Sequence, residues 1–283
     1  MTHSYRILDP SQPSSKFAGK CALAVMAKAP RPGMVKTRLS PPLTPEQASE
    51  LNACFLRDTI ASLSAATLAA SAEWVISYTP VGEEAAFRGI LDDGAFLLPQ
   101  RGDGFGERLL ATAEDLFACG FSAVCLIDSD SPTVPTAEFV RAAELLLAPG
   151  RRAVLGPSED GGYYLIGLQR PEAHLFPEAH LFEGIAWSTA VVSAQTMKRA
   201  EEIQLPIELL REWYDVDDAN SLARLSAEFF DPGTTVPKGY PAPGTRQYLS
   251  ELPGLALAAI PAIIEAESPA CALPVNFSFE EAR

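Results

Sequence analysis

Short apolar runs of strand length alternate with longer segments of helical periodicity between residues 20 and 230. The apolar runs predict β-strands at Cys21–Ala27, Trp74–Tyr78, Ala95–Leu98, Ala123–Ile127, Arg152–Leu155 and Tyr163–Leu168. The segments around them predict helices at Pro45–Leu68, Glu83–Leu91, Gly104–Cys119, Pro135–Leu147, Thr189–Glu202 and Asp218–Phe229. Strands that alternate with helices form parallel sheets with right-handed crossovers. The pattern therefore predicts an α/β protein with a mostly parallel central sheet and helices on both faces.

The ends of the chain differ from this central region. Residues 1–19 are polar and predict a flexible arm, and residues 232–283 form a C-terminal extension that is first rich in Pro and Gly and then apolar. The apolar part, Leu249–Ile264, predicts either an additional helix or a subunit contact. The second alternative would make the protein a homo-oligomer. A hexapeptide is duplicated in tandem over residues 171–182, which indicates a tolerant surface loop. We therefore do not expect its histidines, His174 and His180, to bind metal.

The overall charge narrows the class of partner. The net charge is −14, with 36 acidic and 22 basic residues, so nucleic acid is not expected as a partner.

The N-terminus lacks the apolar core of a signal peptide, and no apolar run is long enough to span a bilayer. The five cysteines show no metal-binding spacing, which favours a reducing compartment. We expect a cytoplasmic protein.

A cationic loop follows the first predicted strand in this acidic chain. It contains Lys28, Arg31, Gly33, Lys36, Thr37 and Arg38. Ligands of open α/β sheets lie beyond the carboxyl ends of the strands, and phosphate favours guanidinium and ammonium groups. The loop therefore predicts a phosphate site, and a solvated surface turn is the alternative.

Carboxylates follow the central strand at Asp128 and Asp130. Such oxygen ligands suit Mg²⁺ or Mn²⁺, which bind one or two carboxylates together with substrate phosphates. Asp217, in the segment Asp215–Asp218, is a candidate third ligand. The alternative is that both acidic clusters cap the helices that follow them.

A turn with paired glycines follows the strand Arg152–Leu155. It reads Glu159-Asp160-Gly161-Gly162-Tyr163. Asp160 or Glu159 could orient an acceptor hydroxyl or take its proton, while the glycines allow a ligand to approach the backbone. A plain hairpin turn would carry the same Asp-Gly signal.

Two weaker candidates complete the predicted site. Gly104 and Arg108 lie at the start of a predicted helix, where backbone amides can bind an anion. Trp187 and Ser188 are candidates for an acceptor-binding wall, together with Gly161, Gly162 and Tyr163. Tight packing or helix capping explains these residues equally well.

Five segments of the chain resemble a family of bacterial transferases, the radical-SAM/selenodomain-associated transferase 1 family, and occur in the order found in that family. They are residues 27–39, 128–132, 156–168, 187–189 and 214–218. Its members are commonly labelled proposed glycosyltransferases of arsenosugar-type pathways and have a GT-A-like, nucleotide-diphospho-sugar transferase fold. The resemblance covers about residues 20–231, and the first segment is also similar to 2-phospholactate guanylyltransferases. It implies that Lys28, Lys36 and Arg38 face nucleotide phosphates and that Asp130 holds a divalent metal. Asp128 departs from the family, because glycine is common at that position.

The motifs and the resemblance together predict a metal-dependent transferase with a nucleotide-activated donor and a small-molecule acceptor. A glycosyltransferase would use a nucleotide-sugar and release a nucleoside diphosphate. The alternative is a nucleotidyltransferase, which would use a nucleoside triphosphate and release pyrophosphate. A second alternative is a nucleotide-binding protein without catalytic activity.

Overall fold

An eight-stranded mixed sheet forms the centre of the protein, in the strand order β1-β4-β3-β2-β5-β7-β6-β8. The computed structural model describes residues 5–171, 177–233 and 239–252. The strands are β1 (Arg6–Ile7), β2 (Cys21–Lys28), β3 (Ala72–Thr79), β4 (Phe96–Pro99), β5 (Ala123–Ile127), β6 (Ala153–Pro157), β7 (Tyr163–Gln169) and β8 (Ile207–Leu209). Only β7 runs antiparallel to its neighbours, β5 and β6, so the sheet is mostly parallel, as predicted.

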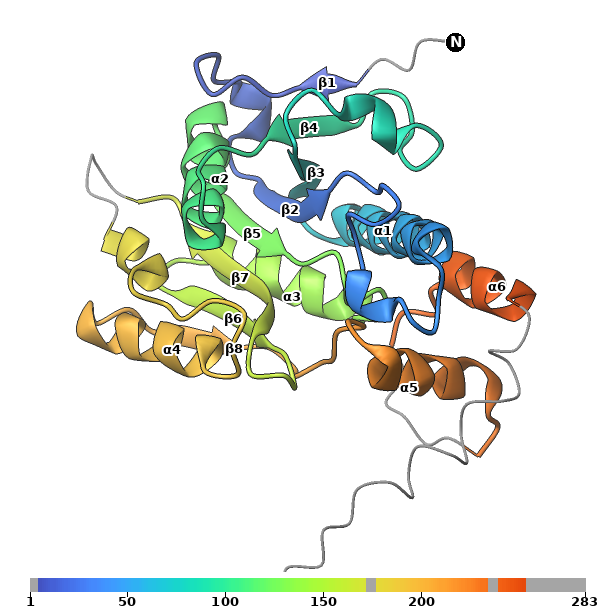
Figure 1. The fold of residues 1–283 in the computed structure, drawn as a ribbon. Helices are drawn as coiled ribbons and strands as arrows, with labels where there is room; N and C mark the ends of the chain where they lie inside the picture. The colour runs from blue at the N-terminus through green and yellow to red at the C-terminus, as the bar shows by residue number, and fades with distance from the viewer. Residues whose placement is uncertain (1–4, 172–176, 234–238, 253–283) are drawn as a thin grey trace, which may run out of the picture.

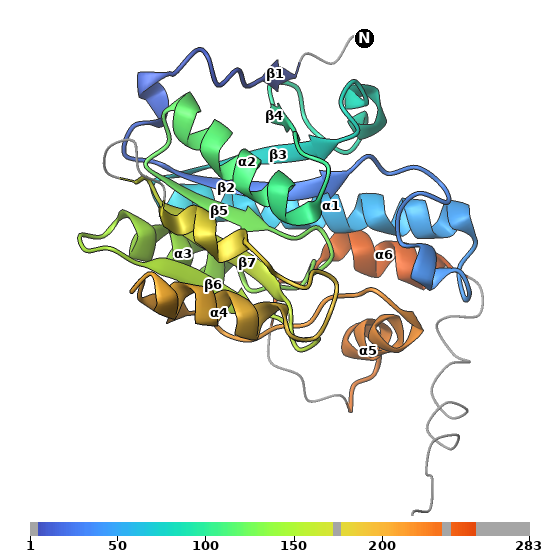
Figure 2. The ribbon, with the colours of Figure 1, turned by 60° about the vertical axis from the view of Figure 1, so that its left-hand side comes forward.

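Helices cover both faces of the sheet, which confirms the predicted fold class (Figure 1). On one face lie α1 (Pro45–Ala69), α3 (Thr136–Leu147), α5 (Ala219–Phe230) and α6 (Pro243–Glu251). On the other lie α2 (Phe105–Cys119) and α4 (Val192–Glu202), as the rotated view shows (Figure 2). The central strands are apolar on both sides because each faces both layers. In β2, for example, Leu23 and Val25 pack toward α1, whereas Ala22 and Ala24 pack toward α2.

Helix α1 begins where the sequence predicts it. Thr44 accepts a hydrogen bond from the backbone N–H of Gln47 at 3.2 Å, and Gln47 accepts one from the N–H of Thr44 at 2.9 Å. This reciprocal cap satisfies amides that have no partner within the helix, and Pro45 occupies the first helical position. The helix therefore starts at a fixed residue and places its later turns beside the loop that follows β2.

The expected flexible arm differs from the structure, because residues 5–19 pack on the edge of the sheet. Strand β1 pairs with β4, and the N–H of Leu8 donates to the carbonyl of Leu97 at 2.8 Å. Phe17 is buried and stacks on Phe121 with ring centroids 4.1 Å apart. The buried apolar side chains of Leu8 and Phe17 thus hold the arm against the sheet, although most of its residues are polar.

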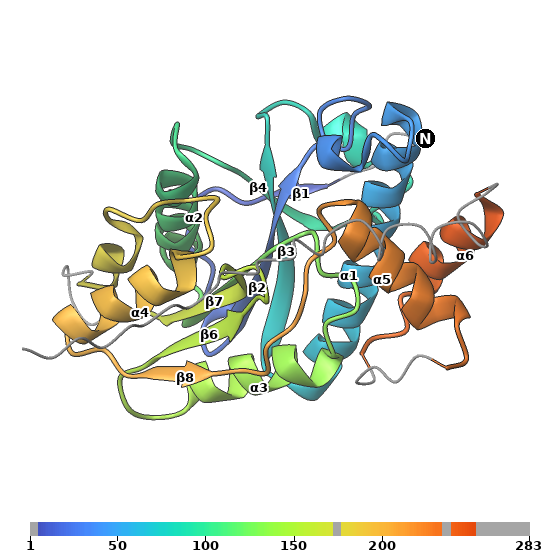
Figure 3. The same cartoon turned by 60° about the horizontal axis from the view of Figure 1, so that its bottom comes forward.

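One predicted helix is shorter than expected, and one strand was not predicted. The helix expected at Glu83–Leu91 is a single 3-10 turn, Glu84–Phe87, and β8 is a short strand that the pattern does not reveal. In the extension, α6 packs beside α1 and α5 (Figure 3). The buried Asp58 of α1 accepts hydrogen bonds from the N–H groups of Gly244 and Thr245, at 3.0 and 2.7 Å. The expected element at Leu249–Ile264 lies largely outside the described residues.

Within the described ranges, none of the helices combines the length and the apolar character needed to cross a bilayer.

Candidate functional site

The candidate site lies at the carboxyl ends of β2, β5 and β6. These three strands are parallel to one another, since β7 is antiparallel to both β5 and β6. The cationic loop after Lys28, the acidic turn after Ile127 and the turn after Pro157 therefore meet at one edge of the sheet. This edge is where open α/β sheets bind ligands.

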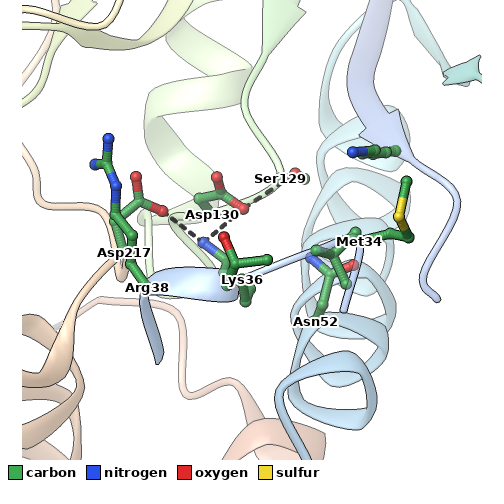
Figure 4. A pocket seen from close by; sticks show the side chains of 10 residues that line it. Met34, Lys36, Arg38, Asn52, Ser129, Asp130 and Asp217 are labelled. Atoms are coloured by element: carbon green, nitrogen blue, oxygen red, sulfur yellow. Dashed lines mark hydrogen bonds and ion pairs between the residues drawn. The ribbon is translucent and has the colours of Figure 1, made fainter. Parts of the chain in front are cut away.

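The cationic loop lines a cavity of about 250 Å³. Four of the predicted phosphate-binding residues line it, Lys28, Lys36, Thr37 and Arg38. Asp130 and Asp217 line it too, and both lie beside Lys36 (Figure 4). We name this space the cationic cavity.

Lys36 is held between two of the three predicted metal ligands, Asp130 and Asp217. Its ammonium Nζ lies 2.8 Å from Oδ1 of Asp130 and 2.8 Å from Oδ1 of Asp217, and it donates to the carbonyl of Val216 at 2.8 Å. The Lys36 side chain is only 4% exposed. Burial lowers its pKa, but the two carboxylates more than offset this effect, so the pKa of Lys36 is raised. The three oxygens satisfy the three protons of the ammonium.

A second cavity of about 300 Å³ adjoins the first, because Asp130 and Asp217 line both. Five aspartates face it: Asp128, Asp130, Asp160, Asp215 and Asp217. Its apolar wall includes Met26, Phe105, Tyr163 and Trp187. Phe105 and Trp187 meet edge to face with centroids 5.3 Å apart. We name this space the acidic cavity.

Burial and the neighbouring carboxylates raise the pKa values of two of these aspartates. Burial, and then the charges of Asp160 and Asp217, raise the pKa of Asp215 to about 6. Burial and the charge of Asp130 likewise raise the pKa of Asp128, although Ser131 donates a hydrogen bond to it at 2.7 Å. The acidic cavity therefore favours a cation, or a ligand that donates protons.

Asp160 belongs both to a hairpin turn and to the acidic cavity. The turn joins β6 to the antiparallel β7, and Asp160 Oδ1 accepts a hydrogen bond from the N–H of Gly162 at 2.8 Å. Gly161 has φ +89°, and a Cβ there would lie 2.1 Å from the carbonyl oxygen of Ala190. The segment therefore forms a hairpin turn and also places Asp160 in the acidic cavity.

Several of the predicted residues do not line either cavity. Glu159 forms an ion pair with Arg224 instead. Arg108 donates to the carbonyl of Asp103 at 2.9 Å, and Gly104 is the N-cap of α2. Their sequence neighbours Phe105 and Leu109 line the acidic cavity instead. Gly33 and Gly161 shape their turns through positive φ angles and are likewise not part of the cavity walls. By contrast, Gly162, Tyr163, Trp187 and Ser188 line the acidic cavity.

Several lining residues were not among the predicted site residues, and Asp215, Asn52 and Phe105 are three of them. Asp215 could have been found from its spacing, because residues i and i+2 of an extended segment point to the same side and Asp217 was a candidate. Asn52 is one of several buried polar residues of α1, so no sequence signal separates it from Ser49 or Thr59. Phe105 carries no sequence signal that separates it from a core residue.

The donor chemistry of the site fits a divalent cation. Carboxylate oxygens are the ligands that Mg²⁺ and Mn²⁺ prefer. Burial, and then neighbouring carboxylates, raise the pKa of Asp128 and of Asp215, and a bound cation would favour their charged forms. Among the described residues no three such side chains are gathered closely enough to hold a metal by themselves. Mg²⁺ typically binds one or two carboxylates plus substrate phosphates, so a complete protein cage is not required. His180 lines neither cavity and pairs with Glu183 and Glu202.

Comparison with known proteins supports the fold. Residues 62–189 match the model of a family described as "uncharacterized protein conserved in bacteria (DUF2064)". A Desulfovibrio desulfuricans protein, described as a proposed nucleotide-diphospho-sugar transferase, is 28% identical, with a TM-score of 0.66 over 82% of this chain and 98% of that chain. Comparison with curated proteins finds no match.

Weaker structural likenesses include an Anaerococcus prevotii 4-diphosphocytidyl-2C-methyl-D-erythritol synthase, 12% identical, with a TM-score of 0.48 over 76% of this chain and 98% of that one. Another is Rv0371c of Mycobacterium tuberculosis in complex with manganese, 16% identical, with a TM-score of 0.45 over 74% and 98% of the two chains. The likeness to the Desulfovibrio desulfuricans structure confirms the predicted α/β fold. The narrower radical-SAM-associated family stays a prediction.

Proposed function

We propose that this protein transfers a sugar from a nucleotide-sugar to a small-molecule acceptor, with Mg²⁺ or Mn²⁺ as its metal. The observation that carries the proposal is the junction of two cavities of opposite character at Asp130 and Asp217. A cationic space beside an acidic, aromatic-walled space suits a phosphorylated donor beside a neutral or cationic acceptor. The 28% identical Desulfovibrio desulfuricans protein, described as a proposed nucleotide-diphospho-sugar transferase, supports the same donor class.

In this proposal the donor phosphates lie against Lys28, Lys36 and Arg38. Lys36 then exchanges at least one carboxylate partner for a phosphate oxygen, because its three protons are already satisfied without a ligand. When bound by Asp130 and Asp217, the divalent cation supplies charge neutralisation at the diphosphate that leaves. Fixed charges aimed at the leaving group are usually the largest single contribution to this kind of catalysis.

The acceptor lies in the acidic cavity, with its reacting hydroxyl near Asp160. Asp160 orients that hydroxyl or accepts its proton, a contribution of typically 10²–10⁴-fold in rate. Phe105, Tyr163 and Trp187 cover the acceptor and exclude water from the donor, which limits hydrolysis. The four free buried cysteines among the described residues agree with a reducing, cytoplasmic location, which is part of the proposal.

The test is a screen of nucleotide-sugars, nucleoside diphosphates and nucleoside triphosphates by thermal shift, each with and without Mn²⁺. A ligand at about 100 times its dissociation constant adds about 2.7 kcal/mol of stability. We expect metal-dependent stabilisation by a diphosphate or nucleotide-sugar, lost in Asp130→Ala, and release of a nucleoside diphosphate on turnover. Preference for a triphosphate with release of pyrophosphate would instead identify a nucleotidyltransferase. Binding without turnover would favour a noncatalytic protein.

A further inference from the structure

Asn52 is a buried amide on the wall of the cationic cavity. It lies on α1, on the face that also carries the buried Ala48, Phe55 and Leu56, and it is 4% exposed. Figure 4 shows it rising from α1 toward the loop that carries Met34 and Lys36. Burying a polar side chain is costly unless it is hydrogen-bonded, so the partners of Asn52 are informative.

The amide oxygen of Asn52 has no such partner. Oδ1 is buried, and no donor in the described parts of the chain forms a hydrogen bond with it. The nearby ammonium of Lys36 does not supply one, because Val216, Asp130 and Asp217 take its three protons. An unpaired buried acceptor is destabilising, and one in a cavity wall is placed where a bound molecule could supply the missing donor.

The chemistry of the missing partner follows from the acceptor. Ionised phosphate oxygens only accept hydrogen bonds, so the phosphates expected beside Lys28 and Arg38 cannot satisfy Oδ1. A nucleotide offers donors elsewhere, in its ribose hydroxyls and in the amino groups of its base. We propose that Asn52 determines specificity by accepting a hydrogen bond from a hydroxyl or amino group of the nucleotide. This assignment rests on the proposed function and deepens it.

The experiment compares the wild-type protein with Asn52→Leu, which keeps the approximate shape and removes the amide. Calorimetric titrations with Mg²⁺ use the four common nucleoside diphosphates, their 2′-deoxy and 3′-deoxy forms, and inosine diphosphate. The nucleotide that binds best should bind Asn52→Leu about ten-fold more weakly, as expected for one lost hydrogen bond. Its analogue that lacks the donor should bind both proteins equally weakly. A deoxy analogue with this behaviour identifies the ribose, and a base analogue identifies the amino group.

Thr59→Val is the matched control. Thr59 is on the same helix, is 4% exposed and also has a buried oxygen without a partner, but it lines neither cavity. Without nucleotide, both variants should melt at or above the wild-type temperature, because each loses an unsatisfied buried group. Only Asn52→Leu should lose affinity.

Two results would overturn the assignment while leaving the proposed function intact. The first is affinity within about two-fold of wild type for every nucleotide in Asn52→Leu. The second is an equal loss of affinity for every nucleotide, the deoxy and inosine analogues included. The amide would then contact the phosphates, which all of these nucleotides share. If the wild-type protein binds no nucleotide, the proposed function fails, and the assignment fails with it.

Discussion

The ammonium of Lys36 lies 2.8 Å from the carboxylate of Asp130, on a side chain that is 4% exposed. The same ammonium lies 2.8 Å from Asp217, so a lysine expected to face phosphate instead stands between two expected metal ligands. In the absence of ligands, Lys36 therefore acts as the counter-ion of these carboxylates. Binding of the donor phosphates or of a metal ion would therefore have to break at least one of these two contacts.

The first prediction concerns the replacement of Lys36 by methionine. Lys36→Met should lower the free energy of unfolding by roughly 1–3 kcal/mol, because it leaves two carboxylates without their counter-ion. The carboxylates remain 34% and 42% exposed, which keeps the cost below that of a fully buried pair. Mn²⁺ alone should raise the melting temperature of Lys36→Met more than that of the wild type, since the lysine no longer competes for the carboxylates.

Thermal denaturation with and without Mn²⁺ measures both effects. Lys28→Met is the control, because Lys28 lines the same cavity but is exposed. It should change stability by less than about 0.5 kcal/mol. An equal response of Lys36→Met and the wild type to Mn²⁺ would show that the lysine does not compete with metal.

The second prediction separates the two neighbouring carboxylates of the glycine turn. Asp160→Asn should reduce transfer to the acceptor by about 10²-fold or more while the donor still binds, because Asp160 faces the acidic cavity. Glu159→Gln should leave turnover near wild type, since Glu159 is paired with Arg224. That exposed pair is worth at most about 1 kcal/mol. Steady-state kinetics of both variants decide the matter, and a larger loss in Glu159→Gln would reverse the assignment.

The fold was largely predictable because its signals are local or periodic. Apolar runs such as Ala123–Ile127 and a complete cap at Thr44 and Gln47 specify their elements without reference to distant residues. The arm was mispredicted because its order depends on a few long-range contacts, such as Phe17 with Phe121. Composition averages over a segment and does not reveal two apolar residues that find partners elsewhere.

The candidate site was predictable in its parts but not in its pairings. Strand ends placed Lys36 and Asp130 at one edge, yet the direct contact between them depends on side-chain geometry. Glu159 and Asp160 are adjacent in sequence and differ only in the partners they meet, Arg224 for one and the acidic cavity for the other. No motif encodes that difference, because Arg224 comes from a distant helix.

The third prediction is a pH dependence at His180. Glu202 and Glu183 accept hydrogen bonds from its ring and raise the pKa of His180 above the usual 6.5. A raised pKa in the folded state means that the stabilisation is fully present below about pH 6.5 and is lost as the pH rises through the folded value. His180→Gln should therefore lower the melting temperature at pH 5.5 more than at pH 9.

The control for His180 is a neighbouring charge that does not titrate in this range. Arg199 forms an ion pair with the same Glu202 at 2.8 Å. The change in melting temperature caused by Arg199→Gln should be similar at pH 5.5 and pH 9, because the guanidinium stays protonated throughout. If His180→Gln showed the same pH-independent difference, the ring would not be charged in the folded protein.

The last prediction tests how the backbone positions Asp160. Gly161→Ala should cost about 2 kcal/mol or more, because Gly161 has φ +89° and the added Cβ would lie 2.1 Å from the carbonyl oxygen of Ala190. Gly82→Ala is the matched control, since Gly82 has φ +88° and no atom within 4 Å of an added Cβ. It should cost only the conformational strain, about 1 kcal/mol. Because the clash pushes Asp160 away from the segment that carries Ser188, Gly161→Ala should also lose transfer activity at temperatures where it remains folded. Gly82→Ala should retain that activity. Equal stability and activity in the two variants would mean that the hairpin turn moves freely and does not fix Asp160 in the acidic cavity.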